Sequence, residues 1–260
     1  MSITSPPLIE LSRVSLRYGD SPPVLYDINL SLAAGSFHFV SGPTGAGKTS
    51  LLRLLSLSVP PTTGSIRLFG QQIDTSARED VAALRQRIGV VFQDFRLLEH
   101  LSAFDNVALP LRINGADEAE TATFVADMLG WLGLGDKLAT LPSALSIGQR
   151  QMLCIARAVV GKPRLLLADE PTSNIDSRNA ERLMNLFIQL QELGTAVVFA
   201  THSDALMERY AYPVLLLARG RLSRQPARGR AADAEAPDGS ADDAADGSAR
   251  APASPAAVEG

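Results

Sequence analysis

One short stretch limits the possible folds of this chain more than any other. Residues 42–49 read Gly-Pro-Thr-Gly-Ala-Gly-Lys-Thr, which has the G-x-x-x-x-G-K-[ST] spacing of a phosphate-binding loop. An apolar, β-prone segment at 37–40 precedes the loop, and a helical pattern at 50–55 follows it. The glycines therefore lie where a strand turns into a helix, so backbone N–H groups can curl around an anion. Chance gives this pattern in only about 1% of chains of this length.

We therefore expect this segment to bind the phosphates of a nucleotide together with Mg²⁺. Lys48 would reach the β- and γ-phosphates, and the hydroxyl of Thr49 would ligate Mg²⁺. The predicted nucleotide-binding residues of the loop are Gly42, Pro43, Thr44, Gly45, Ala46, Gly47, Lys48, Thr49 and Ser50.

Composition excludes several other classes of protein. Hydrophobic residues make up 46% of the 260 residues, which is enough for a full core. No apolar run approaches the roughly 18 residues that span a bilayer, so we expect no membrane insertion. Residues 1–7 lack the basic and apolar regions of a signal peptide. The single cysteine, Cys154, excludes an internal disulfide, and its apolar neighbours favour a place in the core.

Charge divides the chain unevenly. Residues 231–260 carry seven acidic residues and one arginine, a net charge of −6, whereas the whole chain carries −4. The remainder is therefore near neutral, and we expect no nucleic-acid partner. From about residue 224 the composition is dominated by Ala, Asp, Gly, Pro and Ser, which cannot bury enough apolar area to fold. We expect a disordered acidic tail at 224–260, either a solvated appendage or a regulatory segment.

Strands and helices alternate in the rest of the chain. Two segments of alternating polarity, at 8–17 and 24–32, predict an antiparallel meander before the loop. Apolar runs at 88–92, 165–168 and 195–200 predict buried parallel strands, because helical patterns separate them.

A helical insertion at about 95–160 lies between the two halves of this core. We expect Trp131 to pack in the core on the apolar face of the insertion. The predicted fold class is α/β: a phosphate-loop core with a mainly parallel sheet, an N-terminal antiparallel β subdomain and a helical insertion, all within residues 1–223.

Polar residues follow three of the predicted parallel strands. Gln93, the pair Asp169 and Glu170, and His202 come at strand ends, where ligands bind in parallel sheets. Asp169 suits a Mg²⁺ site and Glu170 suits a base that acts on water, whereas Gln93 alone is compatible with an ordinary turn. Tyr18 is equally compatible with stacking on an adenine and with a strand end.

The order of these motifs resembles the ATP-binding cassette of ABC transporters over about residues 8–223. The most specific part is Leu-Ser-Ile-Gly-Gln at 145–149, which opens a predicted helix. The segments 90–98, 105–111 and 167–172 are similar to the cell-division branch of this family. The lipoprotein-releasing and macrolide-efflux branches share much of this pattern.

The resemblance implies a role for each residue of the motifs. Tyr18 would stack on adenine, and His202 would contact the γ-phosphate. Gln93 would contact Mg²⁺ or the attacking water, Asp169 would hold Mg²⁺ through water, and Glu170 would polarise the attacking water. Asp176 would lie at the dimer seam. With Lys48, the residues Gln93, Glu170 and His202 form the expected catalytic set.

The family also implies partners. Sites in this family are shared between two copies, so Ser146 and Gly148 of one copy would close over the ATP bound in the other. An integral membrane subunit similar to FtsX would dock near residues 93–111, which places the chain peripherally at the cytoplasmic face of the inner membrane. Candidate contacts with it are Phe95, Leu97, Leu98 and Phe104, for which core packing is the alternative.

Three other functions compete with an ATPase of cell division. The first is the ATPase of a lipoprotein- or drug-exporting complex. The second is an ABC protein of DNA repair or translation, which would need two cassettes or a long coiled-coil insertion; the sequence has neither. The third is an ATP-sensing scaffold without hydrolysis, against which the presence of both Glu170 and His202 argues.

The helix-opening segment departs from the family pattern. Gly usually stands where this chain has Ile147, and an acid and Gln where it has Gln149 and Arg150. A β-branched residue disfavours positive φ. If the backbone needs positive φ there, Ile147 strains the closed dimer; if it is an ordinary helix start, Ile147 only adds bulk.

We predict that the chain retains ATPase activity but hydrolyses slowly. The measurement is the hydrolysis rate of Ile147→Gly against that of the unchanged protein. An unchanged rate with intact ATP-driven dimerisation would show that the departure is neutral.

Overall fold

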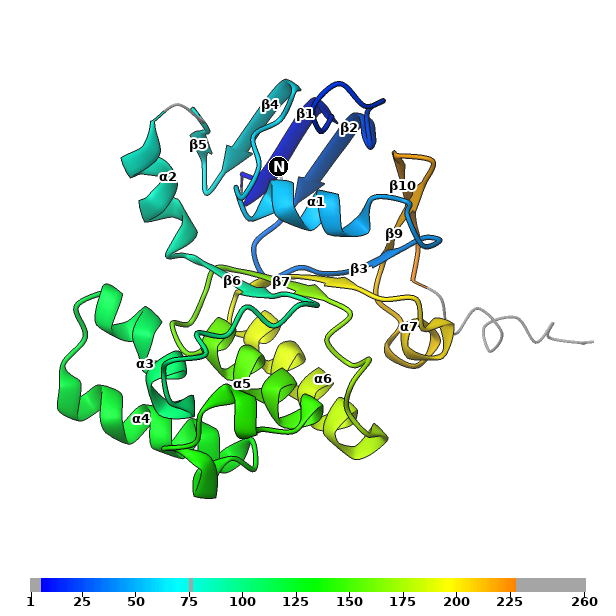
Figure 1. Ribbon diagram of the computed structural model, residues 1–260. Coiled ribbons are helices and arrows are strands. Elements are labelled where there is room, and N and C mark those ends of the chain that lie inside the picture. The colour runs from blue at the N-terminus through cyan, green and yellow to red at the C-terminus, as the bar shows by residue number, and fades with distance from the viewer. Residues whose placement is uncertain (1–5, 75–76, 228–260) are drawn as a thin grey trace, which may run out of the picture. The chain divides into compact units, whose positions relative to one another are not determined.

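The computed structural model describes residues 6–74 and 77–227, so most of the predicted tail lies outside the described residues. A six-stranded sheet lies at the centre of this part (Figure 1). Its strands, in spatial order, are β10 (Arg221–Gln225), β9 (Val214–Ala218), β3 (Phe37–Ser41), β8 (Ala196–Ala200), β7 (Leu165–Asp169) and β6 (Ile88–Val91). All neighbours are parallel except β10 and β9. The predicted mainly parallel sheet is therefore confirmed.

Strand β10 extends the folded part beyond the expected boundary at residue 223. Arg224 and Gln225 continue the antiparallel ladder opposite Leu215 and Val214. The composition of residues 224–225 does not indicate this strand, because an edge strand is held by backbone pairing, which needs no apolar side chains.

A second sheet of four antiparallel strands forms the expected N-terminal β subdomain. Its order is β2 (Leu25–Leu32), β1 (Ile9–Leu16), β4 (Thr63–Leu68) and β5 (Gln71–Gln72). Buried and more exposed residues alternate along β2, as its sequence pattern predicts. This sheet covers one face of helix α1 (Figure 1).

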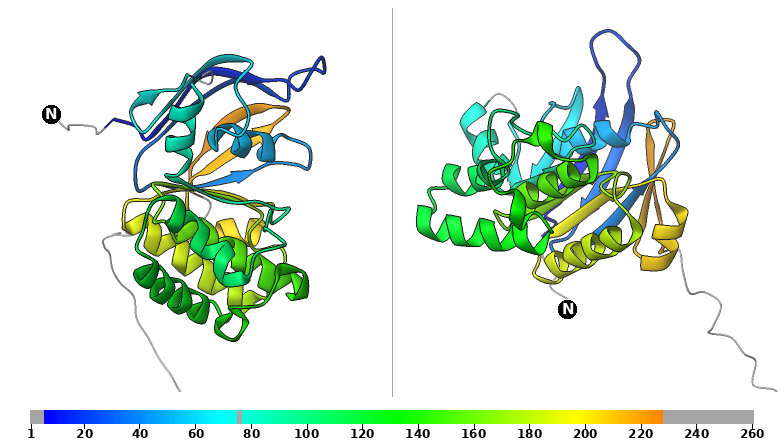
Figure 2. Two further views of the ribbon diagram at one scale, coloured as in Figure 1. Left: turned by 60° about the vertical axis from the view of Figure 1, so that its left-hand side comes forward. Right: turned by 60° about the horizontal axis from the view of Figure 1, so that its bottom comes forward.

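Helices cover both faces of the central sheet. The helices are α1 (Lys48–Leu55), α2 (Arg78–Arg85), α3 (Ala103–Ile113), α4 (Glu118–Trp131), α5 (Ile147–Val159), α6 (Ser177–Glu192) and α7 (Asp204–Tyr210), with 3₁₀ turns at Gly135–Lys137 and Pro142–Ala144. Side chains of β7 alternate between two cores. Leu165 and Leu167 pack with α1 and the antiparallel sheet, whereas Leu166 and Ala168 pack with α5 and α6. Figure 2 (left) shows the green and yellow helices on one side of the central sheet and the blue and cyan segments on the other.

Local side chains set the starts of the helices. Ser102, Asp117 and Asp176 accept backbone hydrogen bonds at the N-termini of α3, α4 and α6. Ser146 forms a reciprocal capping box with Gln149 at the start of α5. Helices α3, α4 and α5 fall within the expected helical insertion.

Trp131 is not a core residue, so that prediction is wrong. Its side chain is 46% exposed, and the guanidinium of Arg182 lies 5.3 Å from the ring centroid. Val125 and Leu129 form the buried face of α4. Trp131 stands two positions after Leu129, which turns it to the opposite side of the helix. By contrast, Cys154 is buried as predicted.

Gly89 sets how closely α5 approaches the sheet. A Cβ added there would lie 2.2 Å from the carbonyl oxygen of Ala158, whereas one added at Gly161 would meet nothing within 4 Å. We predict that Gly89→Ala lowers the free energy of unfolding by about 1–3 kcal/mol through overpacking. Urea denaturation of Gly89→Ala and of the control Gly161→Ala measures this, and equal stabilities of the two variants would contradict it.

Candidate functional site

Neighbouring parallel strands bring the predicted polar residues to one edge of the sheet. β3 leads into the phosphate loop, β8 into His202, β7 into Asp169 and Glu170, and β6 towards Gln93. These ends meet because parallel neighbours in register terminate on the same side. A cavity of about 410 Å³ opens there, lined by Val24, Thr44, Gly45, Ala46, Gly47, Lys48, Thr49, Ser50, Gln93, Asp169, Glu170, Ser173 and His202.

The phosphate loop depends on backbone conformations that only glycine adopts easily. Gly47 caps α1 with φ of 103°, and a Cβ on Gly42 would lie 2.1 Å from the carbonyl oxygen of Leu217. The Lys48 ammonium turns back onto this loop. Its Nζ donates to the carbonyl oxygens of Gly42 at 2.7 Å and Pro43 at 3.4 Å. The ammonium group of Lys48 therefore lies against the phosphate loop, where we expect it to reach the β- and γ-phosphates.

Thr49 and Asp169 form a compact pair of oxygen ligands. The Thr49 hydroxyl donates to Asp169 Oδ2 at 2.7 Å, and Asp169 is only 5% exposed. Burial raises the pKa of the Asp169 carboxyl, while the Thr49 hydrogen bond and the Lys48 charge act in the opposite direction. A hydroxyl beside a carboxylate fits Mg²⁺, which takes few protein oxygens and keeps phosphate and water ligands.

Glu170 and His202 form a second pair. His202 Nδ1 lies 2.8 Å from Glu170 Oε1; the His202 side chain is 74% exposed and that of Glu170 12%. Glu170 adopts a φ of 50°, which is unusual for a residue with a side chain. Its N–H donates to Ala200, and its carbonyl accepts from the Ser173 hydroxyl. The backbone thus holds the carboxylate at the cavity, where it can accept a proton from water.

Gln93 and Tyr18 differ in their relation to the cavity. Gln93 is exposed and lines the cavity, as expected for a residue that contacts the nucleotide site. Tyr18 is 38% exposed and does not line it; its hydroxyl donates to Ser50 Oγ at 3.3 Å. Tyr18 therefore stands beside the start of α1, and stacking on adenine stays a prediction.

Ser146 and Gly148 lie in a different cavity. This cavity of about 330 Å³ also includes Asp176, whose pKa is lowered by hydrogen bonds from the backbone and side chain of Asn179. No residue lines both this cavity and the one at the phosphate loop. Within one copy, the helix-opening segment is thus separate from the phosphate loop.

Ile147 is the first residue of α5 and does not adopt positive φ. The structure therefore supports an ordinary helix start, and the strain alternative does not apply to this conformation. The side chain is 54% exposed, so the substitution adds apolar bulk to the surface beside Ser146.

The four candidate contacts for a membrane subunit are mostly packing residues. Phe95, Leu97 and Phe104 pack against the core. The backbone of Leu98 exchanges hydrogen bonds with the buried Asn106 side chain. The core alternative therefore describes their surroundings better than exposure to a partner does.

Sequence reasoning missed three residues at or near the site. Val24 and Ser173 line the phosphate-loop cavity, and Arg157 holds the turn that follows Gln93. Arg157 stands one helical turn after Cys154, which places both side chains on one face of α5. That spacing could have indicated that the two side chains share a partner. Which backbone carbonyls they contact, however, is set by the conformation of the loop after Gln93.

Comparison with known proteins identifies the family. The family model described as ABC transporter matches residues 25–173. The chain belongs to the ABC transporter family. It is 39% identical over 223 residues to the cell division ATP-binding protein FtsE of Mycobacterium tuberculosis, which covers 85% of this chain and 97% of that protein. It is 38% identical over 215 residues to FtsE of Escherichia coli K12, covering 83% and 97%.

Solved structures agree with this assignment. A dimeric post-hydrolysis state of the ATP-binding cassette MJ0796 bound to ADP and Pi matches with a TM-score of 0.79 and 29% identity, over 85% of this chain and 99% of that one. The cbiO1 component of the cbiONQ ABC transporter of Clostridium perfringens matches with a TM-score of 0.74 and 27% identity, over 86% and 90%. The predicted family and the α/β fold class of an ABC nucleotide-binding domain are confirmed.

Asp169→Asn should stabilise the nucleotide-free protein. Because the pKa of Asp169 is raised in the fold, its ionisation costs stability as pH rises through the unfolded and then the folded pKa. Removing the charge should raise Tm at pH 7 by about 2–4 °C, and the gain should shrink as pH falls. Thermal unfolding measures this. The exposed-residue control Asp127→Asn should change nothing, and a lower Tm for Asp169→Asn would contradict the account.

Proposed function

We propose that this chain is the ATP-binding and ATP-hydrolysing subunit of a bacterial ABC-type membrane complex, of the FtsE kind, that acts in cell division. The observation that carries the proposal is the single cavity into which four strand ends bring the phosphate loop, the Thr49–Asp169 pair and the Glu170–His202 pair. The similarity to FtsE proteins over most of the chain supports the cell-division assignment.

ATP would bind with its phosphates on residues 42–50. Lys48 would exchange the carbonyls of Gly42 and Pro43 for the β- and γ-phosphates, because a full negative charge attracts the ammonium more than a carbonyl dipole does. Thr49, Gln93 and, through water, Asp169 would hold Mg²⁺. The ion supplies neutralisation of the phosphate charge.

Glu170 would act on the attacking water. Its carboxylate would accept the proton as water approaches the γ-phosphate, a contribution of roughly 10²–10⁴-fold in rate. His202 orients this carboxylate through Nδ1. Its other ring nitrogen, Nε2, would be left to contact the γ-phosphate.

A second copy of the chain would complete the site. The N-terminus of α5 has backbone N–H groups and a dipole that favour a negative charge. Ser146 and Gly148 of one copy would cover the γ-phosphate bound by the other, with Asp176 at the seam. The dimeric ADP- and Pi-bound state of the related cassette MJ0796 supports this arrangement.

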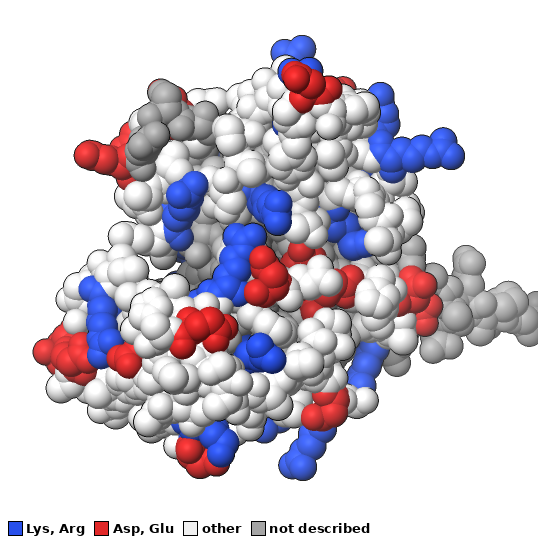
Figure 3. Space-filling model, in the orientation of Figure 1, with Lys and Arg blue, Asp and Glu red and all other residues white. Residues whose placement is uncertain are grey.

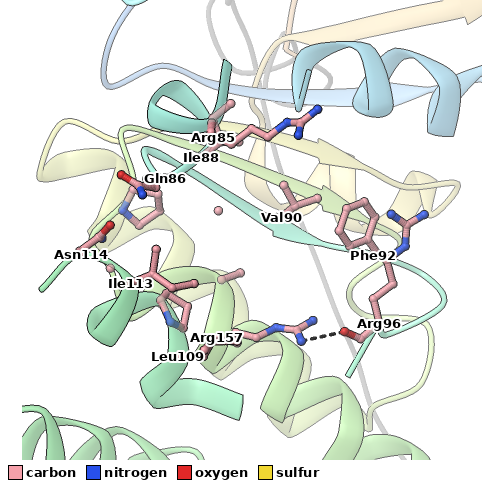
Figure 4. Close-up of a pocket in the computed structure, with 16 residues that line it drawn as sticks. Arg85, Gln86, Ile88, Val90, Phe92, Arg96, Leu109, Ile113, Asn114 and Arg157 are labelled. Atoms are coloured by element: carbon pink, nitrogen blue, oxygen red, sulfur yellow. Dashed lines mark hydrogen bonds between the residues drawn. The ribbon is translucent and has the colours of Figure 1, made fainter. Parts of the chain in front are cut away.

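A groove next to Gln93 offers a docking place for an FtsX-like integral membrane subunit. This groove of about 530 Å³ has apolar walls that include Phe92, Leu109 and Ile113 (Figure 4). Arg96 and Arg157 also line it, and Figure 3 shows basic side chains gathered around a hollow on this face. Docking there would place the chain peripherally at the cytoplasmic face of the inner membrane.

No helix among the described residues is long and apolar enough to cross a bilayer.

Glu170→Gln tests the catalytic assignment. We predict that kcat for ATP falls by roughly 10²–10⁴-fold, while ATP still binds, because the amide keeps the shape but cannot accept a proton. Steady-state ATPase assays measure this, with Glu181→Gln on the surface of α6 as the control. Equal rates for Glu170→Gln and the unchanged protein would overturn the assignment.

The partner separates cell division from the export alternative. Co-purification of the full chain with an FtsX-type subunit in detergent supports the proposal. Stable capture of an export permease in its place would assign the chain to a lipoprotein- or drug-exporting complex.

A further inference from the structure

Two side chains of α5 hold the turn that follows Gln93. Arg157 donates from Nη1 to the carbonyl oxygen of Arg96 at 2.7 Å and from Nη2 to that of Phe95 at 2.9 Å. The Cys154 thiol lies 3.0 Å from the same Phe95 oxygen. Figure 4 shows Arg157 reaching across the groove to the Arg96 carbonyl. We call Arg157 and Cys154, with the two carbonyls, the α5 clip.

The clip holds a backbone conformation that needs support. Phe95 and Arg96 have φ of 57° and 50°, two successive left-handed residues with side chains. Such residues persist only where their surroundings determine them. The other side of the turn is held by the Arg96 guanidinium, which lies 3.8 Å from the Phe92 ring centroid and pairs with Asp94 at 3.1 Å. Gln93 directly precedes this doubly held turn.

The composition of the clip is unusual for simple packing. No carboxylate among the described residues lies within ion-pair distance of Arg157, so its partly buried charge is directed at carbonyl oxygens. An apolar side chain would fill that space without the desolvation of a cation. Burial raises the pKa of the Cys154 thiol to about 12, so the thiol stays protonated and can donate.

Helix α5 connects the clip to the segment that faces the other copy. It begins at Ile147 behind the Ser146 cap, and Arg157 lies about 15 Å further along its axis. The residues between them are largely buried against the sheet and the other helices. A displacement of the Gln93 turn would therefore be transmitted along a packed helix.

We propose that Arg157, with Cys154, is a positioning residue that fixes the Gln93 turn to α5, so that Gln93 at one nucleotide and Ser146 at the other move as a unit. The inference rests on the proposed function, because it takes Gln93 to contact Mg²⁺ or the attacking water. Arg157 itself touches neither; it acts through the carbonyls of Phe95 and Arg96.

A double-mutant cycle between Gln93→Ala and Arg157→Met tests this in the full chain. Arg157→Met should lower kcat by on the order of ten- to a hundred-fold, with KM for ATP nearly unchanged. If Arg157 acts through Gln93, the double variant should have the kcat of Gln93→Ala alone. Arg67→Met, an exposed arginine on β4, is the control and should keep the kcat of the unchanged protein.

Conservative variants separate positioning from loss of structure. Cys154→Ala should lower kcat less than Arg157→Met does. Cys154→Ser keeps a hydrogen-bond donor and should return kcat to that of the unchanged protein. Should Arg157→Met fail to fold, this cysteine pair combined with Gln93→Ala supplies the same cycle.

The outcomes separate the role of Gln93 from that of the α5 clip. If Gln93→Ala lowers kcat and the Arg157 and Cys154 variants multiply that loss, the inference falls while the role of Gln93 stands. If Gln93→Ala leaves kcat unchanged, the role of Gln93 and the inference built on it both fall.

Discussion

The structure depends on four parallel strands that end together at one edge of the central sheet. Backbone hydrogen bonds hold β3, β8, β7 and β6 in register, so each strand delivers a different polar residue to the same place. The rest of the fold keeps this edge in position. Helices α5 and α6 cover one face of the sheet, while α1 and the antiparallel sheet cover the other. Both faces are apolar, so polar chemistry is confined to the strand ends.

That confinement has an energetic cost that the site offsets locally. Asp169 is a buried carboxylate stabilised by the Thr49 hydroxyl, and Glu170 has a left-handed backbone held by hydrogen bonds from both sides. Such features are typical of sites built to receive a charged ligand. The second cavity, at Ser146, shares no lining residue with the one at the phosphate loop, so under the proposed function a second copy would be needed to complete the site.

Patterns local in sequence predicted most of this arrangement. The loop glycines, the strand-end residues and the Ser146 cap each depend on a few neighbouring positions. Contacts between distant segments could not be read in that way. Trp131 looked like a core residue by type, but its position on α4 turns it outward. The contacts of Arg157 depend on the left-handed backbone of Phe95 and Arg96, which the amino-acid composition does not predict. The end of β10 depends on backbone pairing. The φ of Ile147 could be known only from the conformation of the helix that it begins.

The central claim is that each phosphate loop is half of a site that a second copy completes. The most direct measurement is ATPase rate per chain against protein concentration, with molar mass followed by light scattering in Mg–ATP. The account predicts a rate per chain that rises with concentration and levels off as the mass approaches twice the 27.6 kDa of one chain. A constant rate per chain at the mass of one copy, at every concentration, would contradict it.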